Sequence, residues 1–87
     1  MKNNPFPSNS KLEQAIIDAL ELLGGEAKVP EINTKVIEIL QLPQEIVELE
    51  DESGMGTKLN YRLRWCRTNL RGKKIENVVK GTWRLIK

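Results

Sequence analysis

The chain lacks histidine altogether, and its 87 residues include a single cysteine, Cys66. Without an imidazole there is no His-ligated metal and no Ser–His or Cys–His nucleophile pair. One cysteine cannot form an internal disulfide or build a zinc ribbon, and it is typical of a reducing compartment. These absences remove the commonest routes to catalysis, so we expect a protein that is not an enzyme and binds no cofactor or metal.

Long apolar runs and ligand-binding loops are also missing. No run approaches the roughly 18–20 apolar residues that span a bilayer, and the first ten residues lack the apolar middle of a signal peptide. Gly54 and Gly56 have neither a later glycine nor a preceding strand, unlike a phosphate-binding loop. The four acids of residues 48–52 lack the spacing of a calcium loop. We therefore expect a cytoplasmic protein that does not enter a membrane.

Length and composition predict one small domain. The sequence is 39% hydrophobic and 30% charged, which is ordinary for a soluble globular chain. Residues 1–9 hold two of the four prolines and three asparagines. We expect them to form a flexible lead-in, with Phe6 docking on the body, and residues 10–87 to form the domain.

Charge of one sign is nearly absent from the second part of the chain. Residues 1–52 have four lysines and eleven acids, a net charge of −7, whereas residues 53–87 have ten Lys or Arg and one acid, a net charge of +9. A basic excess of this size on a short segment attracts polyanions. The question is whether the basic segment folds into a shape that meets a phosphate backbone.

The first elements follow from caps and apolar spacing. Ser10 with Glu13 fits a capping box at the start of a helix over residues 11–23, whose apolar residues recur at helical spacing. Gly24-Gly25 ends that helix. Residues 26–29 alternate in polarity and predict a brief strand.

A second helix is predicted from Pro30 to about residue 41, because proline suits the first helical turn. Leu42-Pro43 ends it. A short helical turn over residues 44–49 follows, and its inward residues are expected to be Ile46, Val47 and Leu49. Residues 48–52 are then expected to form an exposed acidic loop.

The basic segment begins with a predicted helix over residues 58–71, capped by Thr57. At about 100° per residue its core-facing side is a narrow seam of Leu59, Leu63, Cys66 and Leu70. A basic flank that contains no acid consists of Asn60, Arg64, Arg67 and Arg71, with Tyr61 and Thr68 beside it. The opposite flank consists of Lys58, Arg62, Trp65 and Asn69.

Two residues of this helix have a structural interpretation. We expect Arg62 to pack on the indole of Trp65 or to pair with an acid of the N-terminal half. Cys66 lies on the core seam and is interpreted as a small buried hydrophobic residue rather than a reactive thiol.

After residue 74 the period changes from helical to alternating. Residues 75–79 and 82–86 predict two strands joined by a tight turn at Lys80-Gly81. Trp83 and Leu85 would face the core, with Arg84 on the other side. The resulting order of helix, strand, helix, helix and hairpin is that of an α+β winged-helix domain, a helix-turn-helix with a hairpin wing.

This fold suggests a function for the basic segment. The last helix of such a unit lies in the major groove of double-stranded DNA, where arginine pairs with guanine or phosphate and asparagine reads adenine. The hairpin tip can approach the adjacent backbone. The candidate DNA-binding residues are Lys58, Asn60, Tyr61, Arg64, Arg67, Thr68, Arg71, Lys80 and Arg84.

Three stretches also support a resemblance. They are residues 23–27 leading to 30–32 (LGGEA, then PEI), residues 54–57 and 61–70 (GMGT, then YRLRWCRTNL), and residues 81–85 (GTWRL). With these stretches the chain resembles the N-terminal winged-helix domain of Mrr-type restriction endonucleases. The resemblance implies DNA binding in a restriction or other defence system, with a nuclease or regulator as partner.

The chain departs from that family at three places. The family tends to have a small residue where Cys66 stands and a glycine before the wing, where this chain has Lys73-Lys74. Those enzymes also carry a separate nuclease domain after this one, whereas this chain stops at Lys87. The nuclease activity of the family is therefore not carried over to this chain by the resemblance.

Other interpretations of the same features remain open. The basic flank can be a merely solvated face. The domain can instead be a protein-interaction module or a homodimer, in which the acidic loop of one copy docks on the basic half of another. It can also be a targeting subunit for an enzyme that acts in trans. The DNA sequence or modification recognised does not follow from the chain.

Overall fold

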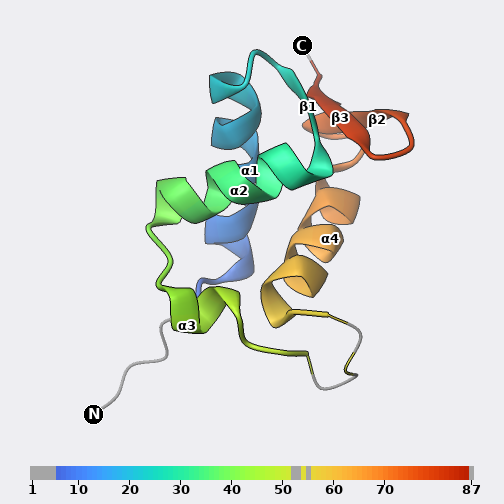
Figure 1. The fold of residues 1–87 in the computed structure, drawn as a ribbon. Coiled ribbons are helices and arrows are strands. Elements are labelled where there is room, and N and C mark those ends of the chain that lie inside the picture. Colours follow the sequence, from blue (N-terminus) through green and yellow to red (C-terminus); the bar gives the residue numbers. More distant parts are fainter. Residues whose placement is uncertain (1–5, 52–53, 55, 87) are drawn as a thin grey trace.

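The computed structural model describes residues 6–51, 54 and 56–86. Within these ranges the chain forms a small α+β domain of four helices and a three-stranded antiparallel sheet (Figure 1). The elements are α1 (Asn9–Leu22), β1 (Glu26–Lys28), α2 (Val29–Leu40), α3 (Gln44–Val47), α4 (Lys58–Leu70), β2 (Ile75–Val79) and β3 (Thr82–Leu85).

Helix α1 begins earlier than its sequence predicts. Ser8, not Ser10, is the N-cap, and its hydroxyl accepts a hydrogen bond from the backbone N–H of Lys11 at 3.3 Å. The predicted capping box is therefore wrong, since Glu13 accepts instead from Asn69 of α4 at 3.4 Å. A second serine two residues upstream offers the same cap and lengthens the helix.

The residues just before α1 also contact the domain. Phe6 packs against the core, and Asn9 is already helical. Asn9, which the expected division at residue 10 places in the lead-in, is the first residue of α1. The expected docking of Phe6 is confirmed, and residues 1–5 of the expected lead-in lie outside the described residues.

Glycine ends α1 as predicted. Gly24 and Gly25 have φ angles of 95° and 97°, which other residues rarely adopt, and the N–H of Gly25 returns to the carbonyl of Leu20. The chain then enters β1 and turns directly into α2, with Pro30 in its first turn.

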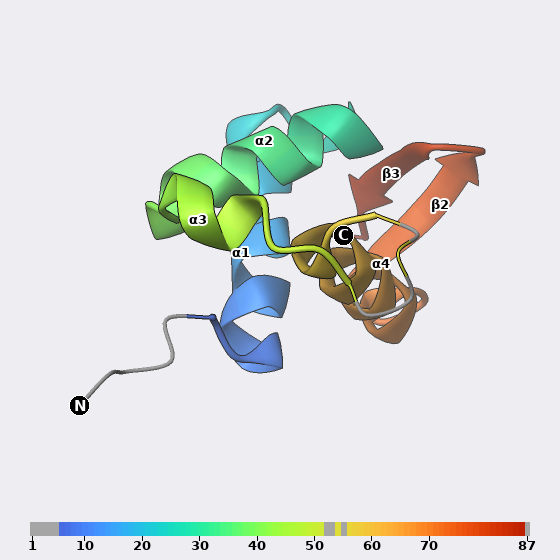
Figure 2. The same cartoon turned by 60° about the horizontal axis from the view of Figure 1, so that its bottom comes forward.

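The sheet has the order β1-β3-β2, so the last strand in sequence is the central one. Ala27 of β1 pairs with Trp83 of β3. The β2–β3 hairpin closes through Gly81, whose φ is 83°, and has an irregularity in register between Asn77 and Val79. Figure 2 shows this hairpin extending beside the helices rather than over them.

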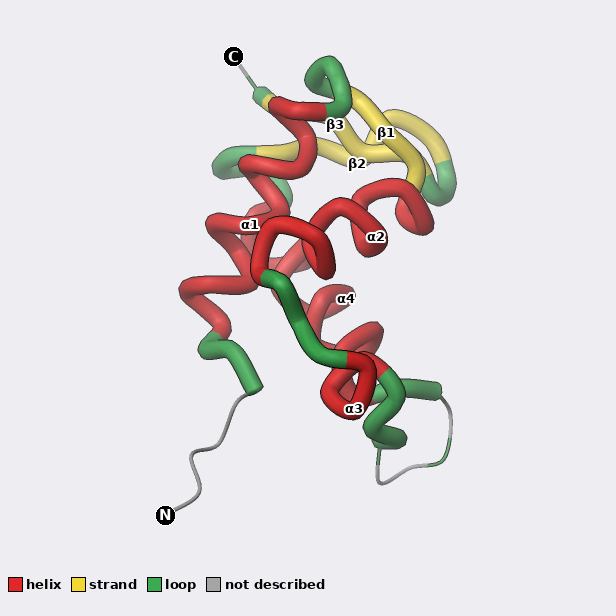
Figure 3. Tube along the Cα trace, turned by 60° about the vertical axis from the view of Figure 1, so that its left-hand side comes forward, coloured by secondary structure: helices red, strands yellow, loops and turns green. Residues whose placement is uncertain are grey.

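The core lies among α1, α2, α4 and the start of the sheet. It is built from side chains at helical spacing on each helix, and the strands gather at one end of the helices (Figure 3). Its largest fully buried side chains are Leu12, Ile16, Leu20, Ile32, Leu59, Leu63 and Ile75. The short helix α3 adds Ile46, whereas Leu49 is 43% exposed, so the prediction that Leu49 faces inward is wrong.

No described helix is both long and apolar enough to cross a membrane.

Candidate nucleic-acid interface

Helix α4 has the cap and the core seam that its sequence predicts. The hydroxyl of Thr57 accepts a hydrogen bond from the N–H of Asn60 at 3.2 Å, and the helix ends at Leu70, one residue before the predicted end. The four seam residues are all buried: Leu59, Leu63, Cys66 and Leu70. This seam fixes which side of α4 faces away from the protein.

That outward side carries two aromatic rings as well as basic groups. Tyr61 and Trp65 are 49% and 51% exposed, and their rings meet edge to face with centroids 6.4 Å apart. With Arg64 and Thr68 they line a shallow hollow of about 290 Å³. The Thr68 hydroxyl donates to the Arg64 carbonyl one turn back, at 3.1 Å.

Trp65 is the residue of this hollow that sequence reasoning missed. Its place on the wheel predicts the flank of Arg62, and the hollow extends from Arg64 across Tyr61 and Thr68 to include it. A signal was present, because Tyr61 and Trp65 are four residues apart and such residues are neighbours on a helix surface.

Helix α2 covers the other end of the predicted basic flank. Arg67 is only 8% exposed, and its Nη1 donates to the side-chain oxygen of Asn33 on α2 at 3.2 Å. Burial, with a smaller effect of the nearby Arg64 charge, lowers the pKa of Arg67. The prediction that Arg67 faces outward is therefore wrong, because α2 lies against that part of α4.

The same α2 residue reaches Asn60. The side-chain nitrogen of Asn33 donates to the Asn60 amide oxygen at 3.5 Å. Since the Asn33 oxygen accepts from Arg67, the two amides and the guanidinium form one chain of contacts between α2 and α4. Asn60 remains exposed at the edge of the outward side.

The N-terminal segment covers the opposite flank. The guanidinium of Arg62 lies 5.1 Å from the centre of the Phe6 ring, and its Nη1 donates to the Asn9 side chain at 3.1 Å. Arg62 therefore packs against the N-terminal segment, as a structural role requires, but its partners are Phe6 and Asn9 rather than the expected Trp65 indole or an acid.

Cys66 is buried on the core seam, as expected. It is 1% exposed, and its Sγ lies 3.9 Å from the carbonyl oxygen of Asn9. Burial, and secondarily the charge of Glu13, raises the pKa of the Cys66 thiol to about 11. The group is therefore a neutral thiol at ordinary pH, as its interpretation as a small hydrophobic residue requires.

The other basic candidates differ in their surroundings. Arg84 on β3 pairs with Glu76 on β2. Lys58 is partly buried at the start of α4. The remaining basic side chains of the second segment, as far as the structure describes them, are exposed and pair with no acid: Arg64, Arg71, Lys73, Lys74 and Lys80.

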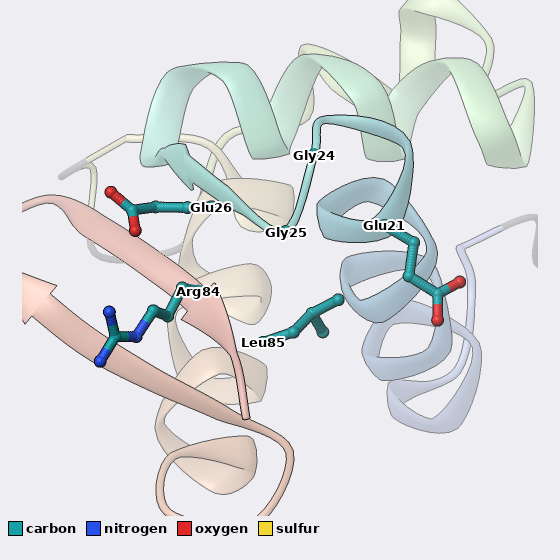
Figure 4. Close-up of a pocket in the computed structure, with 6 residues that line it drawn as sticks. All are labelled: Glu21, Gly24, Gly25, Glu26, Arg84 and Leu85. Carbon is teal, nitrogen blue, oxygen red and sulfur yellow. The ribbon is translucent and has the colours of Figure 1, made fainter. Parts of the chain in front are cut away.

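A larger groove lies between the end of α1 and the strands β1 and β3. It measures about 520 Å³, and its lining consists of Glu21, Gly24, Gly25, Glu26, Arg84 and Leu85. Figure 4 shows Leu85 pointing toward α1, whereas Arg84 points away from it. Because the only cation of this lining pairs with Glu76, the groove has no converging polar groups that would hold a ligand.

No cluster of three or more His, Cys, Asp or Glu side chains capable of holding a metal occurs in the part of the chain that the structure describes. Comparison of the chain with protein-family models, with curated proteins and with solved structures finds no match.

Proposed function

We propose that this domain is a winged-helix module that binds double-stranded DNA, with α4 as the recognition helix and the β2–β3 hairpin as the wing. The element order and the sheet order β1-β3-β2 support this assignment. A helix that contacts bases must present one unobstructed side to the major groove, which is about wide enough for one helix.

The outward side of α4 is the observation that carries the proposal. Arg64 and Arg71 are exposed and pair with no acid in the described part of the chain. Unpaired cations near one another repel, so their accumulation without acids favours a polyanionic partner. Tyr61 and Thr68 add groups that can contact phosphates or bases.

The wing adds charge at a second place. Lys80 is exposed at the hairpin turn, and Lys73 and Lys74 are exposed in the turn that follows α4. These groups suit backbone contacts on either side of the groove that holds α4. Arg84 would contribute only by giving up its pairing with Glu76.

The resemblance to Mrr-type domains adds a context to the proposal. It favours a role in restriction or defence, in which this domain brings a nuclease or regulator to DNA.

A protein-interaction module is the second candidate, and the segregated charge favours it. The acids of the first 52 residues and the bases of the last 35 could join copies of this chain in a homodimer. Sedimentation without DNA tests this candidate, since it requires association that increases with protein concentration and weakens with salt.

The decisive experiment for DNA binding is an electrophoretic shift of duplex DNA across a salt series. Contacts from Arg64, Arg71 and Lys80 with three phosphates give an expected log–log slope of about −3. The double variant Arg64→Ala/Arg71→Ala should bind much more weakly and flatten the slope by up to about two units.

The matched control is Lys35→Ala on α2, which removes a cation that already pairs with Glu38. It should leave both affinity and slope unchanged. If the Arg64/Arg71 variant binds DNA as tightly as the parent, α4 is not the recognition helix, and the interaction module takes the place of this proposal.

A further inference from the structure

The hollow on α4 places apolar surface where a recognition helix lies deepest in the groove. Tyr61 and Thr68 lie almost opposite the core seam, and Trp65 and Arg64 flank them. Each of the two aromatic residues is about half exposed, and neither belongs to the core. A helix that contacted only phosphates would gain nothing from two such rings.

The major groove offers a single apolar group to such a surface. Guanine, adenine and cytosine display hydrogen-bond acceptors and donors there, and thymine adds the methyl group on its C5 atom. Ring faces pressed on polar base edges would remove water from them without replacing its hydrogen bonds, which is costly. Ring faces pressed on a methyl group bury apolar area on both partners.

We infer that the hollow lined by Tyr61, Arg64, Trp65 and Thr68 binds the C5-methyl group of a thymine in duplex DNA. The inference rests on the proposed function and names the base feature that its recognition helix reads. Both aromatic residues line the hollow, and their rings lie at 75° to each other, so the lining is apolar and angled rather than a single flat ring.

Charge around the hollow agrees with this occupant. The lining contains no acid, and Arg64 provides a guanidinium at its edge. A thymine methyl group in DNA lies beside a strand of phosphates, so an apolar contact and a cation contact occur together. Arg64 would bind the phosphate or a neighbouring guanine while the rings cover the methyl group.

The test compares two duplexes that differ only in methyl groups. One is a short alternating adenine–thymine duplex, and the other has deoxyuridine at every thymine position. Both have the same phosphates and the same base pairing, and neither requires knowledge of a preferred sequence. The parent chain should bind the thymine duplex more tightly, by about fourfold for one buried methyl group.

Variants of the two rings show where that preference resides. Tyr61→Ala/Trp65→Ala should bind both duplexes equally, while keeping its circular dichroism because both rings are half exposed. The matched control is Val79→Ala, which removes a 60% exposed apolar side chain from the wing instead. It should keep the preference for thymine.

The outcomes separate this inference from the proposed function. Failure to bind either duplex at low salt overturns the proposed function, and the inference with it. Salt-dependent binding with equal affinity for both duplexes overturns the inference alone. A thymine preference that survives in the Tyr61/Trp65 variant also overturns it, because the methyl groups would then act elsewhere.

Discussion

The two sides of α4 use the same residue type for opposite purposes. On the side that faces the protein, Arg62 lies over Phe6, and Arg67 is buried against Asn33 of α2. Arg64 on the outward side and Arg71, the residue that follows the helix, are exposed and have no acidic partner among the described residues. The difference teaches that neighbouring elements, rather than arginine content, decide which cations of this helix are available to a ligand.

The largest expected effect comes from exchanging a core residue for a charge. Leu63 is fully buried, so Leu63→Asp should lower the free energy of unfolding by more than about 4 kcal/mol and leave the chain unfolded. Thermal melting followed by circular dichroism measures this effect.

The outward counterpart is Trp65→Asp, two residues away. Because Trp65 is half exposed, this variant should remain folded with a cooperative melt. Similar melts for the Leu63→Asp and Trp65→Asp variants would show that the two sides of α4 have been assigned incorrectly.

High pH should lower the free energy of unfolding through Cys66, which lies on the side of α4 that faces the core. Its folded-state pKa of about 11 lies above that of a thiol in the unfolded chain, 9.0. The stabilisation is complete below pH 9 and is lost as the pH rises toward 11, because the unfolded state loses its proton first. Urea denaturation of the parent and of Cys66→Ala at both pH values should differ by about 2 kcal/mol in pH dependence.

Thiol labelling offers a second test of the same burial. In the folded protein at pH 8, Cys66 should react with a thiol reagent only as fast as the domain opens. Immediate labelling without denaturant would contradict the burial of Cys66.

Comparing Arg67 with Arg64 of α4 gives a smaller expected effect on the free energy of unfolding, which separates the two sides of the helix. Arg67→Ala removes a buried side chain and leaves the Asn33 oxygen without its donor, so the free energy of unfolding should fall by about 1–2 kcal/mol. Arg64→Ala should change it by less than about 0.5 kcal/mol, as exposed substitutions usually do. Equal melting temperatures for the two variants would contradict the contrast between the sides.

The smallest effect is expected where the N-terminal segment meets α4. Arg62→Ala removes the contact with Phe6 and the hydrogen bond to Asn9, and should cost about 1 kcal/mol of stability. Arg71→Ala is the matched control, with less than about 0.5 kcal/mol expected. For DNA affinity we expect the reverse order, and a filter-binding assay with duplex DNA measures it.

Local patterns account for the part of this structure that sequence could predict. The period of apolar residues located α4 and its seam, Thr57 marked its start, and the change to alternation located the hairpin. Each of these signals acts over a few residues. The sequence offered two serines for one cap, and the structure uses Ser8 rather than Ser10.

Long-range placement accounts for what sequence could not predict. Arg67 donates a hydrogen bond to Asn33 of α2, a partner 34 positions away in the chain. A helical wheel describes one helix alone, so it showed three arginines together although α2 removes one of them from the surface. The hollow lined by Tyr61, Arg64, Trp65 and Thr68 is a feature of the folded surface, which a helical wheel does not describe.

The central position of β3 has a consequence for the order in which the domain assembles. Trp83 of β3 pairs with Ala27 of β1 on one side and with Asn77 of β2 on the other. The first pairing closes a very long loop of chain, and the second closes only a short hairpin. Closing the long loop costs chain entropy before any contact across it is gained. On a ribosome, α1 and α2 can pack early, but β1 must wait as an unpaired edge until residues 82–85 have emerged. The β2–β3 hairpin is thus the piece whose arrival completes the sheet, and a chain interrupted before it would expose the edge of β1 to other chains.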